Sequence, residues 1–187
     1  MKKDTTSIKT ADITLMALFT AVMAICSWIS IPAAVPFTLQ TFAVFLTVGL
    51  LGGKRGTLTV LVYLLLGAVG VPVFSGFTGG IGHLLGPTGG YIIGFIFSAL
   101  MMWTAEKLFG KSLSVLAFSM AAGLIVCYAF GTAWFVSVYT RTTEPISIMT
   151  ALGWCVFPYI IPDAIKIAVA LILTRRLRPV LANIEAR

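Results

Sequence analysis

Two oppositely charged side chains stand inside the last long apolar run of the sequence, residues 154–174. They are Asp163 and Lys166. A charge at the centre of a membrane helix costs about 2.5–3.5 kcal/mol on insertion scales, and such residues usually have a function. A spacing of three puts both side chains on one helix face, where they can pair or bind the same ligand. The pair therefore indicates a substrate or ion site; the alternative is an ion pair that holds the helix bundle together.

The composition shows what kind of protein must position this pair. Of the 187 residues, 59% are hydrophobic and 10% are charged, and the mean hydropathy is +1.04. Soluble domains carry about 25% charged residues, so this is an integral membrane protein. Its apolar runs are near 20 residues long and lack strict alternation, which predicts an all-α protein. The length allows about six spans and leaves no room for a soluble catalytic or nucleotide-binding domain.

The apolar runs and their breaks predict one membrane domain over residues 1–187. The first run is too long for the core of a signal peptide, so we interpret it as a retained span. Pro158 and Pro162 are expected to kink the last span, and a basic tail is expected after it. The six predicted transmembrane helices cover about residues 11–31, 37–51, 57–70, 91–109, 113–139 and 149–174.

The distribution of positive charge predicts the orientation of these spans. Cytoplasmic loops of membrane proteins are enriched in Lys and Arg. With both termini in the cytoplasm, Arg141 is the basic residue in an outer loop, and Lys166 is left inside a span. This layout explains the net charge of +7 without nucleic acid. The cytoplasmic segments then hold eleven of the 13 basic residues: Lys2, Lys3, Lys9, Lys54, Arg55, Lys107, Lys111, Arg175, Arg176, Arg178 and Arg187.

A glycine-rich stretch, residues 71–90, follows the third predicted span on the outer side. It is too apolar for a solvated loop and too rich in glycine for a helix. Irregular backbone at membrane depth is tolerated only when it is buried in protein or lines a cavity. We expect this stretch to be a loop that caps an outward-facing pocket, and the alternative is a packed re-entrant turn.

Other polar side chains are candidates for the same pocket. Gln40 lies near the outer end of the second span, and Thr78 and Tyr91 lie in or beside the glycine-rich stretch. Each alone is more often a structural hydrogen-bonding residue, but together with the charged pair they could converge on one site. The lone His83 and the three dispersed cysteines predict no metal site, no cofactor and no disulfide.

Small residues in the first span form a candidate docking face. Ala17 and Ala21 are four apart, so they make a flat stripe that lets another helix approach closely. The stripe could contact a partner subunit, or it could pack inside the bundle.

No catalytic motif is evident: the sequence has no phosphate-binding loop, zinc-protease motif or serine-hydrolase motif. A membrane enzyme is therefore the weakest of the candidate functions. A stand-alone carrier driven by an ion gradient, with Asp163 as the coupling group, is a further alternative. The sequence has no obvious inverted repeat, which is unlike many such carriers.

Four segments in order along the chain resemble one known family. They are residues 35–41 (VPFTLQT), 72–80 (PVFSGFTGG), 86–91 (GPTGGY) and 162–166 (PDAIK). The combination of the last two segments is the most specific feature. Through these segments the sequence resembles the BioY family, the biotin-binding S components of energy-coupling factor (ECF) transporters.

The resemblance implies a six-helix S-component fold in a prokaryotic cell membrane and capture of biotin at the outer face. It also implies docking, through Ala17 and Ala21, onto a transmembrane T component that carries two ATPase subunits. Asp163 and Lys166 would contact biotin, whose ureido ring offers two N–H donors and one carbonyl acceptor. An S component for another small vitamin is the alternative within this class.

Further side chains would complete the biotin site. Phe74, Tyr91 and Trp154 are expected to supply an apolar wall for the thioether ring and the valerate chain. Thr78 stands where some members of the family carry asparagine.

Overall fold

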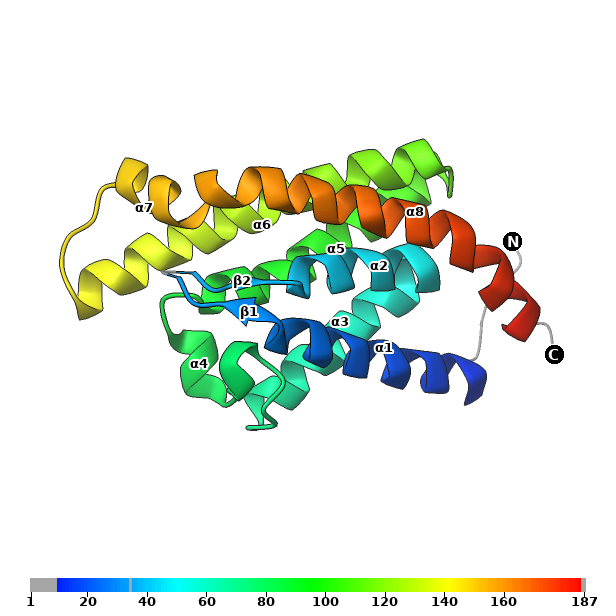
Figure 1. The fold of residues 1–187 in the computed structure, drawn as a ribbon, viewed down its shortest axis with the longest axis horizontal. Coiled ribbons are helices and arrows are strands. Elements are labelled where there is room, and N and C mark those ends of the chain that lie inside the picture. Colours follow the sequence, from blue (N-terminus) through cyan, green and yellow to red (C-terminus); the bar gives the residue numbers. More distant parts are fainter. Residues whose placement is uncertain (1–9, 34, 186–187) are drawn as a thin grey trace.

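The computed structural model describes residues 10–33 and 35–185, and this part of the chain is built mainly of helices (Figure 1). The helices in chain order are α1 (Thr10–Trp28), α2 (Gln40–Leu51), α3 (Gly53–Ala68), α4 (Ile81–Leu85), α5 (Gly89–Phe109), α6 (Leu113–Thr142), α7 (Ile148–Cys155) and α8 (Ile160–Glu185). Two short 3₁₀ turns, η1 (Ser75–Phe77) and η2 (Phe157–Tyr159), and the antiparallel two-residue strands β1 (Ser30–Ile31) and β2 (Phe37–Thr38) connect them.

Within the described part of the chain, four helical segments are long and apolar enough to cross a membrane: α1, α5, α6 and the stretch Ile148–Ala182, which contains α7, η2 and most of α8. The second and third predicted spans correspond to α2 and α3, which have 12 and 16 residues. At 1.5 Å per residue α2 is about 18 Å long, shorter than the hydrocarbon core of about 30 Å. Four of the six predicted spans are therefore long enough to cross a membrane, and α2 and α3 are shorter than the hydrocarbon core.

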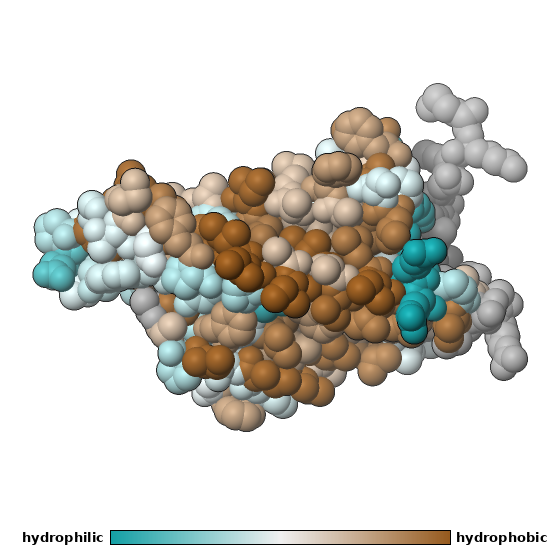
Figure 2. Space-filling model, turned by 45° about the horizontal axis from the view of Figure 1, so that its top comes forward, coloured by the Kyte–Doolittle hydropathy of each residue, from teal (hydrophilic) through white to brown (hydrophobic). Residues whose placement is uncertain are grey.

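The outer surface of the molecule is apolar over most of its length. Figure 2 shows a broad hydrophobic area between hydrophilic residues near the two ends. Large apolar side chains such as Phe118 and Ile161 are 78% and 73% exposed. A soluble monomer rarely exposes a contiguous apolar surface of this size, so this surface fits contact with lipid.

Helix α2 lies at the centre of the bundle and contacts α1, α3, α5 and α8 (Figure 1). Ten of its 12 residues are buried, which explains why its sequence is apolar on every side. Gly49 allows α8 to pack closely, because a Cβ atom there would lie 2.6 Å from Thr174 Oγ1. The position of α2 brings its first residue, Gln40, into the interior near the start of α8.

One end of the molecule gathers the basic segments. The α2–α3 turn, the α5–α6 turn and the end of α8 lie at the same end in Figure 1. Arg178 of α8 ties this end together by donating to the backbone oxygens of Gly49 and Lys111, at 2.9 and 3.0 Å. The expected basic tail after residue 174 is helical, because α8 continues to Glu185.

The last predicted span is interrupted rather than bent. Helix α7 ends at Cys155, η2 contains Pro158, and α8 begins at Ile160. Pro162 is tolerated because it lies in the first turn of α8, where a backbone N–H has no intrahelical partner. The break places Asp163 in that same first turn, where the helix dipole stabilises a carboxylate.

Candidate functional site

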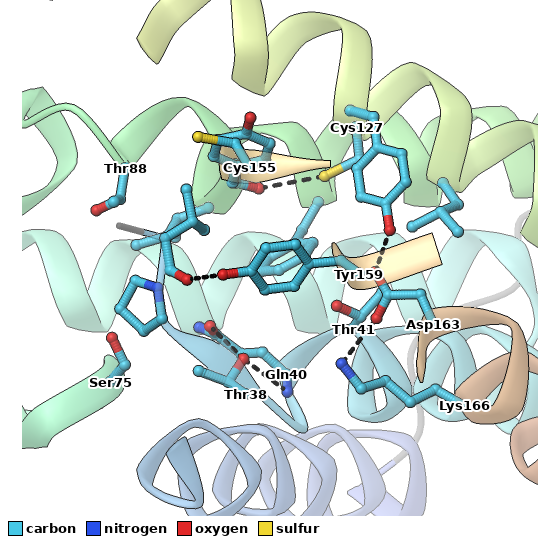
Figure 3. Close-up of a pocket in the computed structure, with 17 residues that line it drawn as sticks. Thr38, Gln40, Thr41, Ser75, Thr88, Cys127, Cys155, Tyr159, Asp163 and Lys166 are labelled. Carbon is cyan, nitrogen blue, oxygen red and sulfur yellow. Dashed lines mark hydrogen bonds and ion pairs between the residues drawn. The ribbon is translucent and has the colours of Figure 1, made fainter. Parts of the chain in front are cut away.

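A pocket opens between the starts of α2 and α5, the middle of α6 and the α7–α8 break (Figure 3). Its empty volume, which includes the open mouth, is about 620 Å³. The pocket is lined by Val35, Pro36, Thr38, Gln40, Thr41, Ser75, Thr88, Tyr91, Ile92, Phe95, Leu124, Cys127, Tyr128, Cys155, Tyr159, Asp163 and Lys166.

The charged pair forms the most polar part of this lining. Lys166 Nζ lies 2.7 Å from Asp163 Oδ1, and the two residues are only 6% and 3% exposed. Tyr128 of α6 donates to the other carboxylate oxygen, Oδ2, at 2.5 Å. The Lys166 ammonium also lies over the Phe37 ring, 4.2 Å from its centroid. Each carboxylate oxygen keeps a free lone pair and the ammonium keeps further N–H donors, so the pair can still bind a ligand.

Neutral polar groups line the rest of the pocket. Gln40, at the start of α2, is 4% exposed, and Thr38 Oγ1 donates to its side-chain oxygen at 3.4 Å. The hydroxyls of Tyr91 and Thr132 are hydrogen-bonded at 2.9 Å, which links α5 to α6. The Cys127 thiol donates to the Tyr91 backbone oxygen at 3.4 Å. These bonds hold the helices that form the wall.

One wall is closed by a contact between distant parts of the chain. The Tyr159 hydroxyl donates to the Val35 backbone oxygen (Figure 3). The Tyr159 ring also stacks on Phe37, with centroids 5.9 Å apart. The β1–β2 connection is thereby fixed to η2. Because Lys166 contacts the same Phe37 ring, this contact also supports the charged pair.

Three predicted site residues lie outside the pocket lining. Phe74 is fully buried and packs edge-to-face on Tyr63, with centroids 5.6 Å apart. Thr78 donates to the Ser75 backbone oxygen at 2.8 Å. Trp154 is 43% exposed and contacts Tyr139 edge-to-face rather than the pocket. Phe74 and Thr78 thus shape the glycine-rich stretch itself.

The glycine-rich stretch contributes two other side chains to the pocket, Ser75 and Thr88. Residues 71–90 are not one open loop, because they contain η1 and α4. His83 of α4 stacks on Phe74, and partial burial lowers the pKa of its imidazole. In the part of the chain that the structure describes, no three His, Cys, Asp or Glu side chains lie together as a possible metal site.

Comparisons with known proteins agree with the resemblance seen in the sequence. The sequence model of the BioY family matches residues 1–183. The chain belongs to the BioY family. It is 43% identical over 163 residues to the biotin transporter BioY of Thermotoga maritima, covering 86% of this chain and 92% of the relative. It is 39% identical over 172 residues to the probable biotin transporter BioY of Pyrococcus horikoshii, covering 91% of this chain and 98% of the relative.

A solved structure shares the fold of this BioY-family chain. It is the crystal structure at 2.1 Å of the S component for biotin from an ECF-type ABC transporter, and it matches with a TM-score of 0.81 at 28% identity. The match covers 96% of this chain and 95% of the other. The S-component fold is therefore confirmed, and the relatives are named as transporters rather than enzymes.

The predicted docking residues of this BioY-family chain lie on its surface. Ala17 and Ala21 are exposed on α1 beside Leu18 and Ile25, which are 56% and 52% exposed. The buried face of α1 instead carries Phe19 and other residues of the core. Within the described residues, the small-residue stripe thus does not pack inside the bundle and is accessible to another helix.

Two tyrosines that line the pocket of this BioY-family chain, Tyr128 and Tyr159, are not among the site residues expected from the sequence. Tyr128 lies in the middle of α6, where a hydroxyl needs a hydrogen-bond partner inside the bundle. Its polar group inside an apolar run is the same kind of signal that indicated Asp163. Tyr159 follows Pro158 in η2, and no periodic pattern indicates where its ring points.

Proposed function

We propose that this chain is the biotin-binding S component of an ECF-type vitamin uptake transporter. The observation that carries the proposal is the buried Asp163–Lys166 pair in the pocket of a BioY-family chain. The names of its relatives and of the similar S component support biotin as the ligand.

The chemistry of the pocket suits biotin at both its polar and apolar parts. Asp163 can accept a hydrogen bond from a ureido N–H, and Lys166 can donate to the ureido oxygen or to the valerate carboxylate. Such charge-assisted bonds to a buried pair are worth about 1.5–3 kcal/mol each. Tyr91, Tyr159 and Phe95 offer rings against which the thioether ring and the valerate chain can pack.

The arrangement in the membrane is part of the proposal. We place both termini in the cytoplasm with six crossings, in which α2 and α3 act as short spans beside the four longer ones. The basic turns and the end of α8 lie at one end of the molecule, as the positive-inside rule requires (Figure 1). The pocket would then open outward, and residues 71–90, which supply Ser75 and Thr88, would cap it.

The partners follow from the same proposal. The exposed stripe of Ala17 and Ala21 would dock onto a transmembrane T component, and two ATPase subunits bound to that component would drive release of biotin. In this proposal the 20.0 kDa chain binds the vitamin and the partner subunits hydrolyse ATP.

Two experiments test the ligand and the partners separately. Mass spectrometry of the protein purified in detergent should identify copurified biotin, and another vitamin in its place would identify a different S component. Uptake in cells should stop when the ATPase subunits are deleted. Uptake that survives this deletion but collapses with a protonophore would instead show a stand-alone ion-coupled carrier.

A further inference from the structure

A tyrosine outside the pocket lining controls the orientation of one pocket side chain. Tyr63 of α3 is fully buried. Its hydroxyl accepts a hydrogen bond from Gln40 Nε2 and donates one to the Val73 backbone oxygen at 2.9 Å. The tyrosine therefore connects the first residue of α2 with the glycine-rich stretch.

The direction of these bonds follows from which groups can donate. The Val73 oxygen can only accept, so the Tyr63 proton points to it, and the Tyr63 oxygen presents only lone pairs to Gln40. The two ends of a glutamine amide are assigned from such networks, and here only the NH₂ end can face Tyr63. The Gln40 oxygen must then face Thr38, which lines the pocket beside Gln40.

The carbonyl that directs this network is itself held in place. Ser27 of α1 donates to the same Val73 oxygen at 2.5 Å, and the Trp28 indole donates to the Pro72 oxygen at 2.9 Å. Phe74, the next residue, fills the space over Gly67, where a Cβ atom would lie 2.0 Å from the ring. The glycine-rich stretch thus fixes Tyr63, and Tyr63 fixes Gln40.

We propose that Tyr63 is a positioning residue that holds Gln40 as a hydrogen-bond acceptor for one ureido N–H of biotin. The inference rests on the proposed function. The ureido nitrogens carry the only N–H groups of biotin, so an acceptor fixed in this way selects for an unsubstituted ureido ring. A buried acceptor left unpaired by the wrong ligand is penalised, which is how such sites discriminate between analogues.

The test compares biotin with its two mono-N-methyl ureido analogues by calorimetry on detergent-purified protein. Wild-type protein should bind one of the two analogues at least tenfold more weakly than biotin. Tyr63→Phe should weaken biotin binding about tenfold and leave binding of that analogue nearly unchanged, so the discrimination ratio falls about tenfold. A merely structural defect would lower both affinities together and preserve the ratio, and that outcome would overturn the inference.

Control variants keep the test decisive. Tyr139→Phe makes the same change on a ring outside the pocket and should leave the ratio unchanged. If Tyr63→Phe does not fold, Gln40→Met, which removes the acceptor with a side chain of similar length, should lose the same discrimination. A Gln40→Met protein with the wild-type ratio would refute the inference. Failure of the wild-type protein to bind biotin would instead refute the proposed function.

Discussion

Removing both members of the Asp163–Lys166 pair at once separates a binding role from a structural role. Each single variant, Asp163→Asn or Lys166→Met, removes the partner that lies 2.7 Å from the remaining charge. Water cannot replace this partner, because the two side chains are only 4% and 7% exposed. Breaking a buried pair costs about 3–5 kcal/mol. For a chain of 187 residues this corresponds to a fall of about 6–20 °C in melting temperature.

The double variant, Asp163→Asn with Lys166→Met, should recover most of this stability and still bind biotin much more weakly than wild type. It leaves no unpaired charge, and the amide oxygen introduced by Asp163→Asn can still accept from Tyr128. Without the carboxylate and the ammonium, at least one charge-assisted bond of about 1.5–3 kcal/mol to biotin is lost, which is about 10–150-fold in affinity. Thermal melts and calorimetry on the same detergent-purified samples measure the two effects. A double variant that binds biotin as tightly as wild type would show that the pair is only structural.

Three further predictions concern other parts of the molecule. Ala17→Trp should prevent copurification with the T component and stop uptake while sparing biotin binding. The control Ala168→Trp, on the exposed face of α8, should assemble normally. Normal uptake by Ala17→Trp would refute the docking face. Gly49→Ala should lower stability by about 1–3 kcal/mol in thermal melts because its Cβ would overlap α8, whereas Gly153→Ala, with no atom within 4 Å of its Cβ, should not. Burial lowers the pKa of His83, so the unfolded chain gains a proton before the folded one as the pH falls below about 6.5. Thermal melts should show stability falling over that pH window, and the fall should be less steep in His83→Gln. The same pH dependence of stability in His83→Gln and wild type would contradict this prediction.

The sequence predicted the parts of the site that follow from the cost of burying charge. Asp163 and Lys166 stand out in an apolar run, and their spacing of three is enough to place them on one face. Gln40 and Tyr91 also lie in the pocket, because each begins or nearly begins a helix after a break that the sequence marks with proline or glycine. The positions of most helices followed from the same breaks.

The remaining site residues depend on backbone geometry that periodicity does not encode. Trp154 and Asp163 belong to different helices, because η2 interrupts the run between them, so their spacing says nothing about a shared face. Phe74 turns toward the core because Gly67 leaves room for its ring. The chain around Thr78 is shaped by Gly76 and Gly80, whose φ angles of 68° and 96° favour glycine.

Calorimetric titration of the purified wild-type protein with biotin tests the central claim most directly. We expect saturable binding of one biotin per chain, with no comparable heat from other vitamins such as thiamine or riboflavin titrated under the same conditions. Absence of biotin binding by folded protein that carries no copurified ligand, or tighter binding of another vitamin, would contradict it.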